Sequence, residues 1–214
     1  MFNILLVLFT CCATRDPISN DQANKSSFLI YFIASEDNLT SNLYSINSDG
    51  TDLKTIFSFG QSIEGELTVS PDMSKFLIGR SGFVHRDGSF FYEFVNSISY
   101  WSLIWTPSGE ELICVYHPSG DTEIVKMDVY GVNRIYLTRN NVDDQNPVFS
   151  IDGDKIYFDR NGQIWQMNTD GSDQSVVIDT IQHLSDLNFN HDGSLFSFSC
   201  QDTILFHRST YIGN

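Results

Sequence analysis

Short runs of apolar residues, separated by turn-forming residues, follow one another along most of the chain. Segments 112–116 and 156–158 carry apolar side chains at every position and segment 196–200 at alternate positions, which is typical of β-strands. Asp, Gly, Asn and Pro interrupt these runs. No stretch of useful length has a helical period. The pattern predicts an all-β fold of short antiparallel strands joined by hairpins.

Two hairpin patterns recur along the chain. In the first, an apolar strand, a polar turn and a second apolar strand repeat roughly 40 residues apart. Its copies are Glu66–Ile78, Leu103–Ile113, Pro147–Phe158 and Leu187–Ser197, with turns predicted to be equivalent at Asp72, Ser108–Gly109, Asp152–Gly153 and Asp192–Gly193. In the second, Leu43–Asp52 recurs as Ile164–Asp173 and, more weakly, as Val125–Asn133. Each repeat therefore supplies four strands.

Four strands in about 40 residues correspond to one blade of a β-propeller. We predict a propeller of about five four-stranded antiparallel blades over residues 28–214, with the first and last blades incomplete. The alternative is an open arc or a fragment of a larger propeller. In the second blade, around Gly79–Ser99, the only turn signal is a displaced Asp87–Gly88.

These repeats resemble a known family. Ser70-Pro71-Asp72 before a Lys-apolar strand, together with the Asn-x-Asp-Gly hairpin, is similar to the TolB-type, WD-like repeat over roughly Phe28 to Arg208. The resemblance implies a β-propeller of the periplasm or cell envelope, like the bacterial envelope propeller lipoproteins, that serves as a platform for protein interaction. Repeat similarity indicates fold more strongly than function.

The N-terminus has a different character from the rest of the chain. Residues 4–9 form an apolar run much shorter than the roughly 20 residues of a membrane-spanning helix. Residues 1–12 are predicted to be an export signal with a lipobox, and residues 13–27 a polar linker. Lipid attachment is expected at Cys11, with Cys12 as the other possibility. A plain secretion signal, a buried N-terminal strand and an incorrect start are the alternatives, since Thr10 and the absence of a basic leader depart from the lipobox pattern.

The charge balance argues against nucleic acid as a partner. Twelve Lys and Arg against 27 Asp and Glu give a formal net charge of −15. The basic residues are scattered singly, so the chain lacks the compact basic patch that a phosphate backbone requires.

Motifs for catalysis or for metal binding are missing from the sequence. Gly79-Arg80-Ser81-Gly82 is the nearest approach to a Gly-x-Ser-x-Gly nucleophile elbow and lacks its final spacing. The five histidines are isolated, and the Asn-x-Asp-Gly turns lack the distal Glu of a calcium loop. Cys114 and Cys200 lie in apolar strands and are expected in the core. We expect no enzyme activity, no metal and no cofactor; the alternative is a peptidase- or glycosidase-related enzyme, or a carbohydrate-binding module, on a propeller framework.

A chain that zigzags through each blade places both hairpin turns at one edge and the irregular loops at the other. Loops on a rigid scaffold are common recognition sites, so we predict a protein or peptide partner there. The candidate partner-binding residues are Tyr100, Trp101, Arg139, Asp143 and Asp144, because aromatic residues and Arg anchor interfaces and paired acids attract basic partners. The alternative is that Trp101 packs between blades and that the two acids are solvated. Membrane contact is expected only through the lipid anchor.

Overall fold

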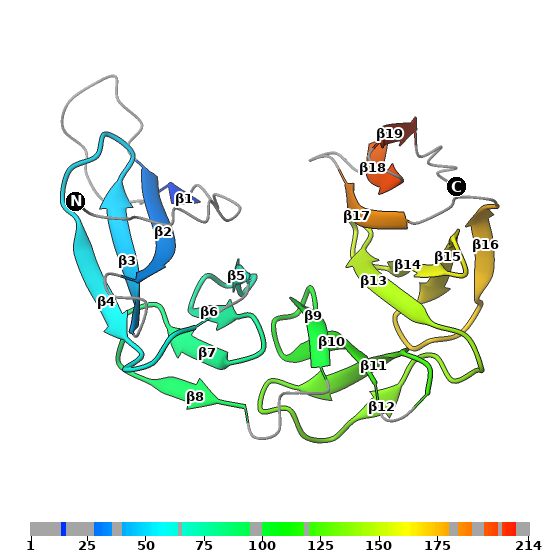
Figure 1. Cartoon of the computed structure of the whole chain (residues 1–214), viewed down its shortest axis with the longest axis horizontal. Coiled ribbons are helices and arrows are strands. Elements are labelled where there is room, and N and C mark those ends of the chain that lie inside the picture. Colours follow the sequence, from blue (N-terminus) through cyan, green and yellow to red (C-terminus); the bar gives the residue numbers. More distant parts are fainter. Residues whose placement is uncertain are drawn as a thin grey trace. The chain divides into compact units, whose positions relative to one another are not determined.

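The computed structural model describes residues 14–15, 28–35, 40–63, 66–94, 100–117, 120–179, 184–189, 195–200 and 203–208, with side chains between residues 28 and 179. The predicted export signal with Cys11, and the predicted turn at Asp192–Gly193, lie outside these residues. The chain divides into two compact units, Met1–Phe94 and Val95–Asn214, and each is described by itself (Figure 1).

The first unit contains two four-stranded sheets in which the strands follow chain order. The first sheet consists of β1 (Thr14–Arg15), β2 (Phe28–Ser35), β3 (Ser41–Asn47) and β4 (Lys54–Ser58). The second consists of β5 (Leu67–Val69), β6 (Lys75–Ile78), β7 (Gly82–His85) and β8 (Phe91–Glu93). The short β1 pairs with β2 and lies within the segment predicted as a linker.

The second unit contains two four-stranded sheets and one three-stranded sheet, again with the strands in chain order. They are formed by β9 (Tyr100–Trp105), β10 (Glu111–Tyr116), β11 (Glu123–Asp128) and β12 (Ile135–Tyr136); by β13 (Asp144–Phe149), β14 (Lys155–Arg160), β15 (Gln163–Asn168) and β16 (Ser175–Ile178); and by β17 (Leu184–Phe189), β18 (Leu195–Cys200) and β19 (Thr203–Arg208). β13 contacts β10 and β11 of the preceding sheet and β17 of the following one.

Each sheet is an antiparallel meander, as expected for a propeller blade. The described residues give five such sheets, and no helix occurs among them. This confirms the all-β fold and the number of blades. Within the described residues, no helix is long and apolar enough to cross a membrane.

The first recurrent hairpin adopts the same turn in three blades. Ser70, Thr106 and Ser150 each donate their backbone N–H to the carbonyl oxygen five residues later, at 2.9, 3.0 and 2.9 Å. Their hydroxyl oxygens accept the backbone N–H of that same residue. A left-handed residue follows three positions after each, namely Met73, Gly109 and Gly153. The predicted equivalence of these turns holds wherever the structure describes them.

The second recurrent hairpin occurs in four blades. Gly50, Gly88, Gly131 and Gly171 each donate their backbone N–H to the carbonyl oxygen three residues earlier, at 2.9 to 3.0 Å. All four glycines have a positive φ. The weak Asp87–Gly88 signal therefore marks the same turn as the clear Asn-x-Asp-Gly copies.

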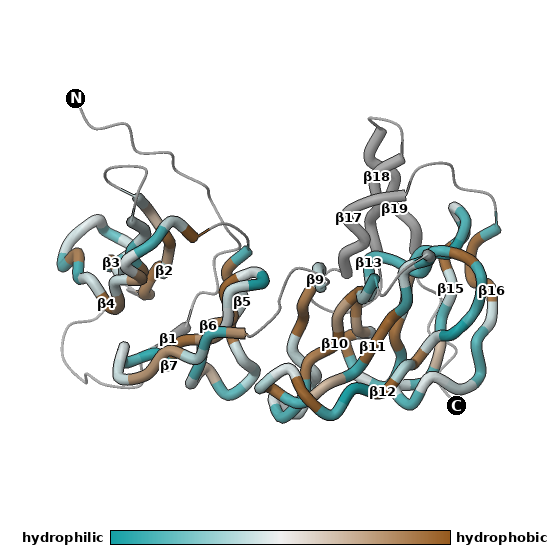
Figure 2. The backbone as a smooth tube through the Cα atoms, turned by 60° about the horizontal axis from the view of Figure 1, so that its bottom comes forward, coloured by the Kyte–Doolittle hydropathy of each residue, from teal (hydrophilic) through white to brown (hydrophobic). Residues whose placement is uncertain are grey.

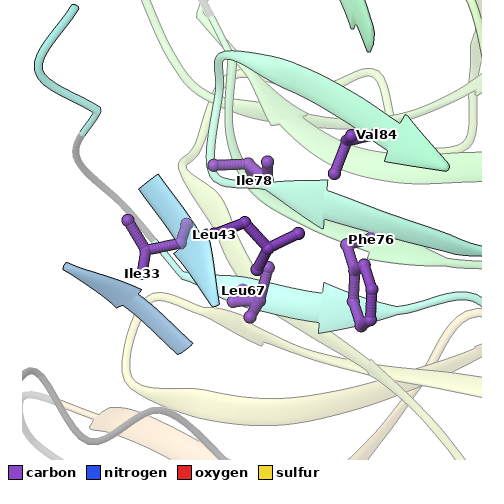
Figure 3. Packing of buried hydrophobic residues seen from close by; sticks show 6 residues of the cluster. All are labelled: Ile33, Leu43, Leu67, Phe76, Ile78 and Val84. Atoms are coloured by element: carbon purple, nitrogen blue, oxygen red, sulfur yellow. The ribbon is translucent and has the colours of Figure 1, made fainter. Parts of the chain in front are cut away.

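Apolar side chains on facing sheets form a core in each unit. In the first, Ile33 and Leu43 pack against Leu67, Phe76, Ile78 and Val84 of the second sheet (Figure 3). In the second, Ile113, Ile124 and Leu137 pack with Ile156, Phe158 and Met167. The hydrophobic stretches follow strands such as β10 and β11, and hydrophilic residues occupy the turns (Figure 2). Cys114 is a free, buried thiol, as predicted for a core position.

Candidate partner-binding loops of the second unit

Two loops of the second unit meet at the edge opposite the two recurrent hairpin turns of the blade. Residues 137–143 join β12 to β13, and residues 117–122 join β10 to β11. The backbone N–H of Asp144 donates to the carbonyl oxygen of Thr122 at 2.9 Å, which ties one loop to the other. This is the edge where the sequence predicted the recognition loops.

Asp144 lies at the base of these loops and is fully buried. Its carboxylate accepts two hydrogen bonds from Arg160, from Nε at 2.6 Å and from Nη2 at 2.8 Å. The Arg160 guanidinium also lies 4.6 Å from the ring centroid of Trp165. Asn140 Nδ2 donates to the same carboxylate at 2.7 Å. Asp144 therefore has a structural role; it was predicted to contact a partner, and in this structure none of its surface is exposed.

Glu123 fixes the loop from the other side. Its carboxylate accepts the backbone N–H of Asn140 at 2.6 Å and the hydroxyl of Thr138 at 2.7 Å. The side-chain oxygen of Asn140 in turn accepts the N–H of Val142 at 2.8 Å. Loop 137–143 is thus anchored at both ends and in the middle, which leaves it little conformational entropy to lose on binding.

Burial changes the acidity of the carboxyl groups beneath the loop. It raises the pKa of Glu123, while the hydrogen bonds from Thr138 and Asn140 oppose the rise and the charges of Asp144 and Asp121 add to it. The pKa of Asp159 is also raised, first by burial and then by the Asp144 carboxylate, against the hydrogen bond from Gly162. In both cases the ionised carboxylate is less well solvated inside the protein than in water, which disfavours the charged form.

Arg139 and Asp143 are the exposed members of the predicted set. The guanidinium of Arg139 lies 5.4 Å from the ring centroid of Tyr136, which is 39% exposed. One carboxylate oxygen of Asp143 accepts the N–H and the hydroxyl of Thr122, at 2.8 and 3.0 Å. The loop therefore exposes an arginine beside the tyrosine that ends β12, and an acidic residue at its other end.

The two aromatic residues of the predicted set begin β9 and have different environments. Trp101 is partly buried, with its ring 5.9 Å from that of His117. Tyr100 is buried and stacks on Tyr116 at 5.1 Å, and burial raises its pKa. Tyr100 therefore stabilises the blade; it was predicted to contact a partner, and only 5% of its surface is exposed.

Two exposed residues that the sequence reasoning missed belong beside Arg139. Arg134 lies 5.4 and 5.3 Å from the ring centroids of Tyr100 and Tyr116, and Tyr116 packs edge-on against Tyr136 at 6.1 Å. The signal in the sequence was the recurrence of tyrosine in three strands of one repeat, at positions 100, 116 and 136. Arg134, Tyr136 and Arg139 thus form one aromatic and cationic surface.

No grouping of three or more His, Cys, Asp or Glu side chains in the described part of the chain is arranged to hold a metal ion. The carboxylate Oδ1 of Asp170 instead accepts the backbone N–H and the hydroxyl of Ser172, at 2.9 and 2.6 Å. The turns that superficially resemble calcium loops therefore use these oxygens for their own hydrogen bonds.

Comparison with solved structures identifies the fold. TolB from Agrobacterium tumefaciens superposes with a TM-score of 0.64 at 19% identity, over 81% of this chain and 67% of that one. TolB from Acinetobacter baumannii gives a TM-score of 0.57 at 15% identity, over 84% of this chain and 50% of that one. An oligogalacturonate lyase in complex with manganese gives 0.61 at 14% identity, over 84% of this chain and 61% of that one.

The chain thus spans between half and about two thirds of the length of these three structures. No protein-family model matches the sequence, and no curated protein does so either. Identity at this level supports conclusions about fold and not about activity. The five antiparallel sheets and these superpositions together show that the chain has a TolB-like β-propeller fold.

Proposed function

We propose that this protein is a non-catalytic scaffold of the bacterial cell envelope that binds a protein or peptide through loop 137–143. The observation that carries the proposal is a rigid loop with exposed anchoring residues. Buried carboxylates of Glu123 and Asp144 hold the loop, while Arg139 and Asp143 remain exposed beside Tyr136. Arginine and tyrosine are enriched among the residues that dominate binding energy, and a preformed loop binds at a low entropic cost.

The envelope location rests on the sequence. The apolar leader and the cysteine at position 11 suggest export followed by lipid attachment, and the resemblance to TolB-type repeats implies the periplasm or the envelope. Labelling with radioactive palmitate in an expressing bacterium tests this part. We expect label on the wild-type protein and none on Cys11→Ser; an unlabelled, unprocessed cytoplasmic product would contradict both export and acylation.

The binding surface is tested by site-specific photocrosslinking in cells. A photoreactive phenylalanine analogue in place of Arg139 should yield a discrete crosslinked product. The matched control carries the analogue in place of Glu110, which is equally exposed but lies in a hairpin turn at the other edge of the same blade. Equal crosslinking at both positions, or none at position 139, would reject this surface.

Alanine variants measure the contribution of individual side chains once the crosslinked partner is purified. Replacing Trp101, Arg139 and Asp143 together should weaken binding at least tenfold, while Glu110→Ala leaves it unchanged. Arg139→Ala alone should account for most of the loss, because it removes an exposed side chain without a described hydrogen bond to the fold. Urea denaturation of each variant shows whether the fold survives.

The alternative function, an enzyme or carbohydrate-binding module on a propeller framework, is separated by direct assay. Purified protein is incubated with peptide and glycan substrates, and turnover is followed by mass spectrometry. Turnover of either class by wild-type protein would overturn the scaffold proposal.

A further inference from the structure

A concave pocket of about 440 Å³ lies among residues of both sheets in the first unit. Tyr31 of β2 contributes from the first sheet, Ser74 from the turn between β5 and β6, and His85, Arg86 and Asp87 from the end of β7 and the turn after it. The volume falls within the range of small-ligand sites, about 300 to 1,000 Å³. The pocket lies at the hairpin-turn edge of the blades, so it is a different site from loop 137–143.

Arg86 is held in a fixed position within this pocket. Its Nε donates to the hydroxyl of Tyr31 at 2.9 Å, and its guanidinium carbon lies 5.7 Å from the Tyr31 ring centroid. Its backbone N–H donates to the carbonyl oxygen of Ser74 at 2.9 Å. Tyr31 in turn packs on Phe76, with ring centroids 4.6 Å apart, against the core shown in Figure 3. The core therefore positions the guanidinium.

The charge of Arg86 is not matched by a described carboxylate. The ion pairs among the described residues join Lys54 to Asp52, Lys126 to Glu111, and Arg160 to Asp144. The Nε of Arg86 donates its hydrogen bond to the Tyr31 hydroxyl. Neither Nη atom of Arg86 donates a hydrogen bond to a described residue. Asp87, the acid in the pocket, accepts the N–H of Ser89 at 2.9 Å. Arg160 shows the contrast, because Asp144 occupies both its Nε and its Nη2.

We propose that this pocket binds an organic carboxylate, which takes up the Nη groups of Arg86. A planar guanidinium matches a carboxylate with two parallel hydrogen bonds, and preorganisation reduces the entropy lost on binding. The ring of His85 lines the pocket and packs at 5.3 Å from that of Phe90, which is 45% exposed. The rings of His85 and Tyr31 in the pocket lining offer contact for an apolar group next to the carboxylate.

The negative charge of Asp87 in the same pocket sets a limit on the ligand. The opposite charges of Arg86 and Asp87 partly cancel for any anion, and their net attraction grows only in proportion to the charge of the ligand. The cost of removing the ligand from water grows with the square of its charge, so a singly charged carboxylate is favoured over a doubly charged phosphate. The ligand class is therefore a monocarboxylate with an apolar or aromatic substituent. It comes either from the C-terminus of a peptide or from a small carboxylic acid.

The test is calorimetric titration of the full chain with N-acetyl-L-phenylalanine and, in parallel, with its amide. We expect saturable millimolar binding of the acid and at least tenfold weaker binding of the amide and of inorganic phosphate. Arg86→Gln should weaken binding of the acid at least tenfold. Arg80→Gln, which removes an exposed cation in the turn between β6 and β7 of the same sheet, away from the pocket lining, is the matched control and should bind like wild type.

A second variant keeps the test decisive if Arg86→Gln does not fold. Tyr31→Phe retains the ring beneath Arg86 and removes only the hydroxyl that holds Nε, so binding of the acid should fall several-fold with the fold intact. Equal binding of acid and amide, wild-type binding by Arg86→Gln, or no binding of the acid at millimolar concentration would each overturn the proposal.

A further pair of probes separates the two sources of the carboxylate. If N-acetyl-Gly-Gly-Phe binds at least as tightly as N-acetyl-L-phenylalanine, the pocket takes the C-terminus of a peptide. If only the smaller acid binds, the pocket takes a small carboxylic acid. Both results support a carboxylate-binding site, and they differ in whether the natural ligand is a peptide C-terminus or a small acid.

Discussion

Asp143 and Asp144 are neighbours in sequence with different roles in the structure. Asp143 is exposed and bonds to Thr122, whereas Asp144 is fully buried and pairs with Arg160. The Arg160 side chain itself is only 12% exposed. A buried charge that loses its partner is costly, so the two positions should respond very differently to the same substitution.

Asp144→Asn should lower the free energy of unfolding by about 3 kcal/mol, because it leaves the Arg160 guanidinium buried without a counter-charge. Asp143→Asn is the matched control. Its side-chain oxygen still accepts from Thr122, so the loss should stay below about 1 kcal/mol. Urea denaturation measures both, and similar losses would contradict the assigned structural role of Asp144.

Asp159 allows a test of the pH dependence of stability. Because burial raises its pKa in the folded state, its ionisation favours unfolding as the pH rises from the ordinary carboxyl range through the folded pKa. Asp159→Asn keeps an acceptor for Gly162 and removes this effect. The stability of the variant relative to wild type should therefore increase between about pH 4 and about pH 7.

Asp87→Asn is the control of opposite sign. Hydrogen bonds from Ser89 lower the pKa of Asp87, so its ionised form stabilises the fold above the ordinary carboxyl range and this contribution is lost on acidification. This variant should lose stability relative to wild type at neutral pH and less in acid. Denaturation series across pH test both signs, and the same trend in both variants would contradict these assignments.

At the scale of strands and turns, the sequence predicted the blades well because the governing signals are local. A hydroxyl at the start of a turn and a left-handed residue three positions later produce the same hairpin at Ser70, Thr106 and Ser150. The first copy was recognisable in the sequence although Met73, and not a glycine, occupies its left-handed position. The weak Asp87–Gly88 signal also marked a real turn.

Burial of loop residues could not be predicted in the same way, because it depends on contacts distant in sequence. Asp144 is buried since Arg160, sixteen residues away, reaches it across the paired β13 and β14 strands. Tyr100 is buried by stacking on Tyr116 of the next strand. The loop sequence alone gives no sign of either partner, so only the exposed candidates Arg139 and Asp143, and the partly buried Trp101, keep their proposed roles.

The turn after β7 packs closely against β4 of the first sheet, so a side chain added to this turn should destabilise the fold. Gly88 has a φ of +73°, and a Cβ there would lie 2.1 Å from the carbonyl oxygen of Ile56 in β4. Gly88→Ala should therefore cost about 3 kcal/mol or more of stability through backbone displacement as well as φ strain. Thermal unfolding measures the loss.

Gly50→Ala is the matched control for this contact. Gly50 occupies the equivalent turn with a φ of +83°, and nothing lies within 4 Å of a Cβ built there. Only the conformational strain remains, about 1 kcal/mol. Equal losses in the two variants would mean that the packing of the turn against β4 contributes nothing.

The whole molecule carries far more negative than positive charge. Its formal net charge is −15, and the described residues form three ion pairs, so most acidic groups have no paired cation in the part of the chain that the structure describes. Self-repulsion of this kind destabilises the compact state and is screened by salt. Both side chains of the Lys54–Asp52 pair are more than half exposed. Such a pair adds little to stability, so screening it by salt should cost little.

Salt should therefore stabilise this protein at neutral pH. Raising the ionic strength from about 0.01 M to about 0.15 M shortens the screening length from about 30 Å to about 8 Å, so we expect the Tm to rise by a few degrees. The control is the same titration near the isoelectric point of about 4.4, where net repulsion vanishes and the rise should disappear. Scanning calorimetry measures both series. A Tm that falls with salt at neutral pH would show that attractive pairs outweigh the net repulsion, and an equal rise at the isoelectric point would assign the effect to something other than charge.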